Sequence, residues 1–454
     1  MSEVQQTRFE SLTDYVQQKM EEHRVPGVAV GVFHEGETST AGFGVTNIEH
    51  PLDVTTETLF QIGSVTKTFT AMAMLRLVEM GKLDLDATVR TYIPDFKVAD
   101  EDTSAKATVR HLLTHVGGWE GDFFEDPGPG SEALAKYVAN MAKLVQIAPV
   151  GKVYSYNNAG FVLAGRIIEV ITGKPYEDVL KEFVLEPLGL ARCYFDAGDV
   201  ITHRFVVGHD EEDEKVKVAR PWPLGRFACP AGGIVCDVHM LLRYGRFHLG
   251  DGTTEDGVQV LSQDSLRQMQ SPQVEIWKDA AVGLSWHISD WDGLRTFGHG
   301  GGTNGQVSTL MLIPEHNTVL VILTNADKGG DLIDDVQRWF MKTYFGVERK
   351  EPEPIDSTEE ELRAFVGRYD RPSAEIELGL LAGQLVGQVR PKEGFPDPSV
   401  VPPPPPPVSV ARCEENRLMI TSGPWKKAQV DVIRNSDGSI GWLRLGRLYK
   451  RVVE

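Results

Sequence analysis

The order of apolar patterns along the first 345 residues constrains the fold more than any other feature. Two β-branched stretches at 27–33 and 38–45, separated by a turn signal, predict a hairpin near the start. Strand patterns return only at 294–297, 307–313 and 318–324, and helical patterns fill the interval. Since both ends supply strands, we expect an α+β fold: an antiparallel sheet flanked by helices, with an inserted helical subdomain.

Helical patterns fill the middle of the chain and also precede the first strand. The run 68–80 is apolar on nearly every side and is followed by Gly81, which predicts a helix buried almost all round. Further patterns predict helices over 9–20, 108–113, 131–144, 159–171, 237–248 and 332–344.

A charged, proline-rich stretch at 350–357 is predicted to be a linker. It divides the chain into a larger domain, 1–349, and a small β-rich, barrel-like domain, 358–454. Strand patterns of the second domain lie at 366–369, 375–380, 385–389, 417–421, 429–433 and 443–449. Six prolines, Pro402 to Pro407, interrupt them as a stiff excursion, because proline cannot donate to a sheet ladder.

Composition excludes several classes of function. Asp plus Glu number 65 against 46 for Lys plus Arg, a net charge of −19, so neither nucleic acid nor an anionic membrane is an expected partner. No secretory signal and no apolar run of about 18 residues is visible, so we expect a cytoplasmic protein. The four cysteines form no CxxC pair, which predicts buried free thiols and no metal site.

The first candidate for chemistry is the stretch Ser64-Val65-Thr66-Lys67 at the start of the buried helix. A spacing of three places both side chains on one helical face. A lysine desolvated by apolar packing can activate a serine hydroxyl, or hold the base that does so. The alternative is a helix-capping serine followed by a solvated lysine, but burying a lysine in an apolar run costs free energy unless it has a function.

The second candidate is the stretch 154–161, which leads into a predicted helix. Tyr156 and Asn158 can present a phenol and an amide to one cavity, where nearby cations would lower the phenol pKa. Tyr154 competes with Tyr156 for this role. A turn with Asn caps and a packed tyrosine is the structural alternative.

The third candidate is the glycine-rich stretch 297–305, placed between two predicted strands. So many glycines favour close approach of a ligand or another backbone. His299 would then face the ligand, and the Gly302 N–H would donate to a developing oxyanion. A flexible glycine hairpin with a surface histidine explains the pattern equally well.

Taken in order, these clusters resemble the motifs of the serine β-lactamase and penicillin-recognising hydrolase family, in particular its class C-like branch of esterases, D-aminopeptidases and D-alanyl carboxypeptidases. The family pattern is SxxK, then YxN, then a K/H-x-G triplet on a sheet strand. It is matched by Ser64 to Lys67, Tyr156 to Asn158 and His299 to Gly301, and the stretches 110–118 and 230–234 add to the similarity. The resemblance spans roughly residues 7 to 346 and implies a β-lactamase-like sheet.

The resemblance also implies roles. Ser64 would be the nucleophile and Lys67 with Tyr156 the proton-handling pair, with either one as the base. Asn158 would bind substrate or Lys67, and His299 would be an electrostatic partner of Tyr156. The oxyanion hole would use the N–H groups of Ser64 and Gly302.

One departure bears on substrate. Many members have Lys-Thr-Gly where this chain has His299-Gly300-Gly301, so a hydroxyl often associated with a substrate carboxylate is missing. We therefore expect a cofactor-independent serine hydrolase of small esters, amides or short peptides, with Trp119, Phe123, Phe124, Trp222 and Phe227 as candidate pocket residues. The alternatives are β-lactamase or D-alanyl carboxypeptidase activity, or a covalent sensor that turns over slowly. The oligomeric state stays open.

Overall fold

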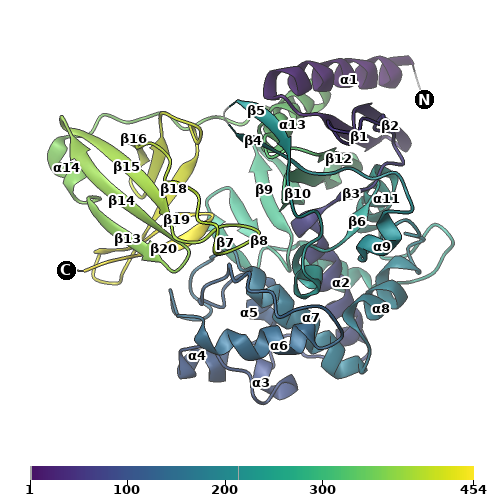
Figure 1. The fold of residues 1–454 in the computed structure, drawn as a ribbon, viewed down its shortest axis with the longest axis horizontal. Helices are drawn as coiled ribbons and strands as arrows, with labels where there is room; N and C mark the ends of the chain where they lie inside the picture. The colour runs from purple at the N-terminus through teal and green to yellow at the C-terminus, as the bar shows by residue number, and fades with distance from the viewer. Residues whose placement is uncertain (1–2, 213, 454) are drawn as a thin grey trace.

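The computed structural model describes residues 3–212 and 214–453. A main domain carries an eight-stranded antiparallel sheet, and a separate closed barrel follows it (Figure 1). The sheet order is β2-β1-β12-β11-β10-β9-β8-β7. These strands are β1 (Gly27–His34), β2 (Glu37–Gly44), β7 (Val274–Trp277), β8 (Ala280–Val282), β9 (His287–Trp291), β10 (Leu294–Thr303), β11 (Gln306–Ile313) and β12 (Thr318–Thr324). The predicted α+β class and the sheet built from both ends are confirmed.

Two layers of helices cover this sheet. The helices of the main domain are α1 (Glu3–His23), α2 (Thr66–Glu79), α3 (Val89–Tyr92), α4 (Glu101–Lys106), α5 (Val109–Leu113), α6 (Ala133–Asn140), α7 (Asn158–Thr172), α8 (Tyr176–Leu180), α9 (Ala197–Val200), α10 (Cys229–Gly232), α11 (Val238–Leu249), α12 (Gln263–Gln270) and α13 (Gly329–Phe345). A further helix, α14 (Glu359–Arg363), packs on the C-terminal barrel instead. Helices α1 and α13 pack on one face, which we call the outer face, through apolar side chains such as Val16 and Phe340. The larger core, with α2, α7 and α11, lies on the opposite, inner face.

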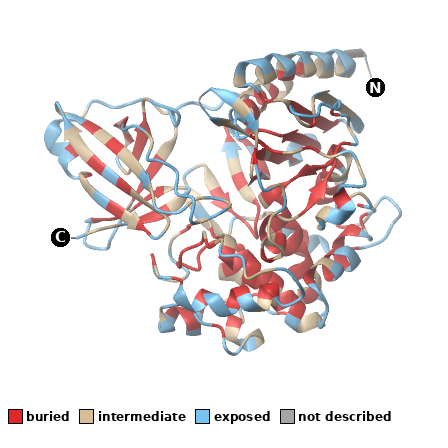
Figure 2. Ribbon diagram, in the orientation of Figure 1, coloured by how far each residue is buried: buried red, intermediate tan, exposed pale blue. Residues whose placement is uncertain are grey.

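Helix α2 is the buried helix that the sequence predicts. Eleven of its fourteen residues are buried, including Lys67, and it lies at the centre of the buried region in Figure 2. The helical subdomain of α3 to α7 lies below the sheet in Figure 1. Two short pairs complete the main domain: β3 (Phe60–Gln61) with β6 (Val235–Cys236), and β4 (His209–Glu212) with β5 (Lys215–Val218).

The C-terminal barrel closes through pairing of its first and last strands. Its strands are β13 (Gly367–Arg371), β14 (Ala374–Leu381), β15 (Gln384–Pro391), β16 (Val408–Glu414), β17 (Arg417–Ile420), β18 (Gln429–Arg434), β19 (Ile440–Leu445) and β20 (Arg447–Arg451). Pro402 to Pro407 lie between β15 and β16, outside any strand. The domain limits at 350 and 358 stay a prediction.

Two local predictions were wrong. The stretch 443–449 is not one strand, because Gly446 adopts φ +67 and reverses the chain between β19 and β20. The strand predicted at 294–297 was too short, because β10 continues to Thr303 and pairs with β11. The glycine-rich stretch is therefore no flexible hairpin, and His299 to Gly301 lie on a sheet strand, as the resemblance implies. The four cysteines are free and buried, as expected. None of the helices in the described ranges combines the length and apolar character needed to cross a membrane.

Candidate active site

Ser64 and Lys67 meet where the chain enters α2. Ser64 lies in a single 3-10 turn, η1 (Gly63–Val65), directly before the helix. The Lys67 Nζ lies 3.0 Å from the Ser64 Oγ and donates to the Ala231 carbonyl at 2.6 Å. The Lys67 side chain is fully buried. The predicted spacing therefore does bring the amine and the hydroxyl into hydrogen-bond contact.

Burial sets the protonation of this amine. Loss of hydration lowers the pKa of Lys67 well below its ordinary value, the nearby Arg447 cation lowers it further, and Asp122 opposes the shift in part. The lowered pKa favours the neutral amine, and only the neutral amine can accept the proton of Ser64.

Tyr156 is the tyrosine that faces this pair. The Lys67 Nζ lies 5.0 Å from the centroid of its ring. Burial raises the pKa of Tyr156, while the Ser64 hydroxyl and the Arg447 guanidinium act in the opposite direction. Tyr154 is turned away, because its hydroxyl lies 2.9 Å from the Nε2 of His287. The geometry therefore favours Tyr156 over its rival.

Asn158 begins α7 and lines the cavity beside Ser64. Its amide nitrogen donates to the Asp122 carboxylate at 2.8 Å. Lys67 hydrogen-bonds to Ser64 and Ala231, so the structure favours the substrate-facing alternative for Asn158 over contact with Lys67.

Strand β10 forms the opposite wall of the cavity. A Cβ on Gly301 would lie 1.9 Å from the Ile62 carbonyl oxygen, so only glycine permits this approach of β10 to the chain leading into Ser64. The approach also brings the backbone nitrogen of Gly302 within 2.6 Å of the position that a Cβ on Gly63 would occupy. The expected oxyanion donor, Gly302 N–H, is therefore adjacent to the turn that carries the nucleophile.

Three histidines surround Tyr156. His115 stacks on it with ring centroids 4.4 Å apart, and the His299 and His287 rings both lie 6.0 Å away. Burial lowers the pKa of His287 to about 4 and holds that of the other two well below the ordinary value. His299 is thus a neutral imidazole at pH 7. Its buried Nε2, which has no partner among the described residues, lines the cavity.

The barrel contributes a residue that the sequence motifs do not indicate. Arg447 follows the Gly446 turn and lies over the Tyr156 ring at 4.5 Å. Its Nε and Nη2 donate to the two oxygens of Asp122 at 2.9 and 3.0 Å, and Arg371 of β13 donates to the same carboxylate at 2.7 Å. Burial would raise the pKa of Asp122, but the two guanidinium groups hold it well below its usual range.

The cavity over Ser64 has a volume of about 1060 Å³. Phe123, Phe124 and Phe227 line it, as expected, and Phe395 of the barrel packs against Phe124 with ring centroids 4.9 Å apart. Trp119 is instead buried in the core. Trp222 packs on Phe205, away from the cavity.

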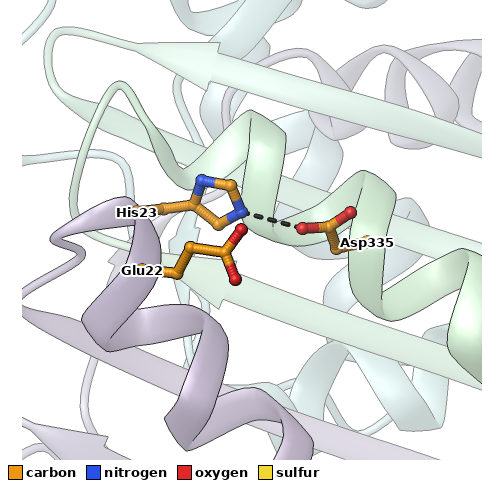
Figure 3. A group of neighbouring side chains, drawn as sticks. All are labelled: Glu22, His23 and Asp335. Carbon is orange, nitrogen blue, oxygen red and sulfur yellow. Dashed lines mark hydrogen bonds and ion pairs between the residues drawn. The ribbon is translucent and has the colours of Figure 1, made fainter.

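One cluster elsewhere has metal-ligand chemistry. Glu22, His23 and Asp335 converge where α1 meets α13 (Figure 3). Lys19 already pairs with both carboxylates, with Nζ 2.8 Å from Glu22 and 3.0 Å from Asp335, and His23 contacts Asp335 at 2.8 Å. An ammonium in this position repels a cation, so the cluster is an ion-pair network that holds α1 on α13.

Comparison with known proteins gives one consistent result. The family model described as Beta-lactamase matches residues 12–340. A relative from Amycolatopsis lactamdurans, named penicillin-binding protein 4, is 34% identical over 380 residues, which cover 81% of this chain and 97% of that protein. A crystal structure of SurE superposes with a TM-score of 0.78 at 23% identity, covering 98% of both chains.

The D-amino acid amidase from Ochrobactrum anthropi superposes with a TM-score of 0.60 at 25% identity, covering 73% of this chain and 99% of that one. The family match extends over most of the main domain, including all three motifs. The chain belongs to the beta-lactamase family of serine hydrolases.

Proposed function

We propose that the protein hydrolyses esters or amides through an acyl-enzyme on Ser64. The observation that carries this proposal is the Ser64–Lys67 pair: a fully buried amine with a lowered pKa, 3.0 Å from a hydroxyl at the wall of a large cavity. A solvated lysine or a simple helix cap would show neither the burial nor the pKa shift.

The first half-reaction would form the acyl-enzyme. The Ser64 Oγ attacks the substrate carbonyl carbon, and its proton passes to neutral Lys67. The Tyr156 phenol, whose pKa burial raises, carries its proton and would relay a proton from Lys67 towards the leaving group by giving up its own and regaining one from Lys67. The oxyanion accepts hydrogen bonds from the Ser64 and Gly302 N–H groups. The bond to the leaving alcohol or amine then breaks, and the leaving group takes up the proton.

The second half-reaction would return the enzyme to its starting state. Water attacks the ester carbonyl of the acyl-enzyme and loses a proton to the same Lys67–Tyr156 pair. The Ser64 Oγ leaves with that proton, and the carboxylic acid is released. Asn158 and neutral His299 line the cavity and would orient the substrate by hydrogen bonds.

The positive charge of Arg447 does not identify the charge of the substrate. Arg447 is a cation at the active site, but it forms a bidentate pair with Asp122, and Arg371, which shares that carboxylate, also lies 3.4 Å from Glu120. Arg447 therefore gives no reason to require an anionic substrate. The similarity to a D-amino acid amidase supports amides of D-amino acids as the first substrates to test.

A substrate panel tests the proposal: p-nitrophenyl esters, D- and L-amino acid p-nitroanilides and a chromogenic cephalosporin. We expect Ser64→Ala to lower kcat/KM by about 10³-fold or more, because the nucleophile is lost. The control is Ser131→Ala, which changes an exposed serine. Unchanged turnover in Ser64→Ala would refute the proposal, and a long-lived adduct on Ser64 without product would favour the covalent sensor.

A further inference from the structure

The cavity has more volume than the acyl group and the leaving group next to a cleaved bond would fill. Pockets that hold a whole drug-sized ligand typically enclose about 300–1,000 Å³, and this cavity reaches about 1060 Å³. It is lined both by Ser64 and by residues on the outer face of the sheet, among them Met311 of β11 and Gln337 of α13. The space therefore continues past the nucleophile to the other side of β10.

The outer part of the cavity has a defined floor. Residues paired across neighbouring strands point to the same face, and the register pairs Gly298, Gly300 and Gly302 with Met311, Thr309 and Val307. Because these three β10 positions have no side chain, the sheet surface beside Thr309 is left bare. We call this space the outer hollow; it is lined by Trp291, Val307, Thr309, Met311, Ile333 and Gln337.

The outer hollow connects with the nucleophile around an edge of β10. The β9–β10 register runs from Leu294 to Gly298 and ends there, while β10 itself continues to Thr303. A Cβ on Gly302 would meet no atom within 4 Å, and one on Gly300 only the Ser308 carbonyl oxygen at 3.8 Å. A substrate chain can therefore pass this edge without displacing side chains.

The lining selects for an uncharged ligand. Trp291, Met311 and Ile333 are buried apolar side chains, and the Gln337 amide donates to the Thr309 hydroxyl at 3.2 Å. The charged residues that line this end, Asp334 and Arg349, are already paired. Apolar walls with a neutral amide and a hydroxyl suit an apolar side chain carried on a peptide backbone.

We propose that the outer hollow binds an apolar residue of a peptide substrate, remote from the bond that is cleaved. The proposal rests on the hydrolase function above and makes its substrate a peptide longer than one residue. It assigns Gln337 and Thr309 to substrate selection, although both lie on the far side of β10 from Ser64.

Binding to Ser64→Ala tests this without turnover. The probes are N-acetyl tetrapeptide amides of Ala and Leu, in all-L and all-D forms, and N-acetyl-alanine amide as the short ligand, all measured by titration calorimetry. We expect a tetrapeptide to bind at least tenfold more tightly than the short ligand, since burying one apolar side chain contributes about 1.5–3 kcal/mol.

Filling the hollow should remove this advantage. Gln337→Trp in the Ser64→Ala background should lose about tenfold in tetrapeptide affinity and leave the short ligand unaffected, and Gln337→Phe should lose less. Thr343→Trp, an exposed position on the same helix, should change neither. Equal affinity for long and short ligands, or full tetrapeptide affinity in Gln337→Trp, would overturn the proposal. Failure of wild type to hydrolyse the panel refutes the hydrolase function instead, so the two failures are distinguishable.

Discussion

The main domain and the barrel reach the same cavity by different means. The main domain supplies Ser64 from the turn before a buried helix, Lys67 from that helix and His299 from a central strand; Lys67 and His299 are buried, and Ser64 and His299 line the cavity. The barrel supplies Arg447 from a hairpin turn, held mainly by one carboxylate of the other domain. The groups proposed to carry the reaction thus belong to the main domain, while the cation that lowers the pKa of Lys67 depends on the docking of the second domain.

The interface between the two domains combines polar and apolar contacts. Trp442 donates its indole N–H to the Ile147 carbonyl at 2.8 Å, and Arg444 donates to Ile276 at 2.5 Å. The Leu448 side chain packs against Ile147 and Ala148. These contacts hold β19 and β20 against the main domain, so displacement of the barrel should change the electrostatics at Tyr156.

The largest expected effect concerns the main-domain half of the site. Lys67→Met should lower kcat/KM by about 10²- to 10⁴-fold, the range typical of a lost proton-transfer group. Folding should be unchanged or more favourable, because a buried amine is replaced by an apolar side chain of similar size. Steady-state kinetics with thermal unfolding check both. Lys67→Arg is the matched variant, since it keeps a cation that cannot become neutral. High activity in either variant would contradict the assignment.

The next effect concerns the link between the domains. Asp122→Ala should lower the free energy of unfolding by about 3–5 kcal/mol, because it leaves Arg447 and Arg371 buried without their shared carboxylate. A double-mutant cycle with Arg447→Met isolates the Asp122–Arg447 interaction. The double variant should lose less unfolding free energy than the sum of the losses in the two single variants. Additive losses would show that the pair does not couple the domains.

The same carboxylate predicts an acid sensitivity. Its folded pKa lies well below the unfolded value of about 3.9. The pair's stabilisation is therefore complete above that value and is lost as pH falls through the folded pKa. Denaturant titrations from pH 6 to pH 2 should show a steeper loss of stability for wild type than for Asp122→Asn. Parallel curves for the two proteins would contradict the prediction.

A smaller effect, on the pH dependence of kcat/KM, should distinguish the role of Arg447 from that of the proposed catalytic groups. Arg447 lowers the pKa of both Lys67 and Tyr156, so Arg447→Ala should raise both. Activity requires the deprotonated base, and the acid limb of kcat/KM against pH should therefore move to higher pH, with lower activity on that limb than in wild type. The acid limb moves to higher pH whether Lys67 or Tyr156 is the base. Arg447→Lys should keep the wild-type profile, and an unshifted limb in Arg447→Ala would show that the barrel cation does not act on the base.

The smallest effect concerns a single contact at the interface. Trp442→Phe removes the hydrogen bond to Ile147 and should cost about 0.5–1.5 kcal/mol in unfolding free energy. Trp425→Phe, at a tryptophan that is 37% exposed, is the control and should cost less. A larger loss in the control would show that the Trp442 contact does not contribute to docking.

Sequence patterns predicted the main-domain half of the site better than the barrel half. Ser64 and Lys67 sit three apart on one helix, so local geometry alone brings them together. Asp122 and Arg447 are separated by 325 positions and meet only through domain docking. No local pattern marks either residue, although the glycine at 446 is compatible with a turn. The β10 prediction stopped at residue 297 because glycine weakens strands on average, whereas here close packing against Ile62 requires it.

The pairing of β1 with β12 affects how the chain is made. Val28 pairs with Thr324, and all eight residues of β1 are buried. During synthesis this apolar strand leaves the ribosome long before its central-sheet partner exists, when of its neighbours only α1 and β2 have been made. Such an edge is prone to pairing with other chains. The nascent protein should therefore need shielding of its first hairpin until the segment around residue 320 has been translated.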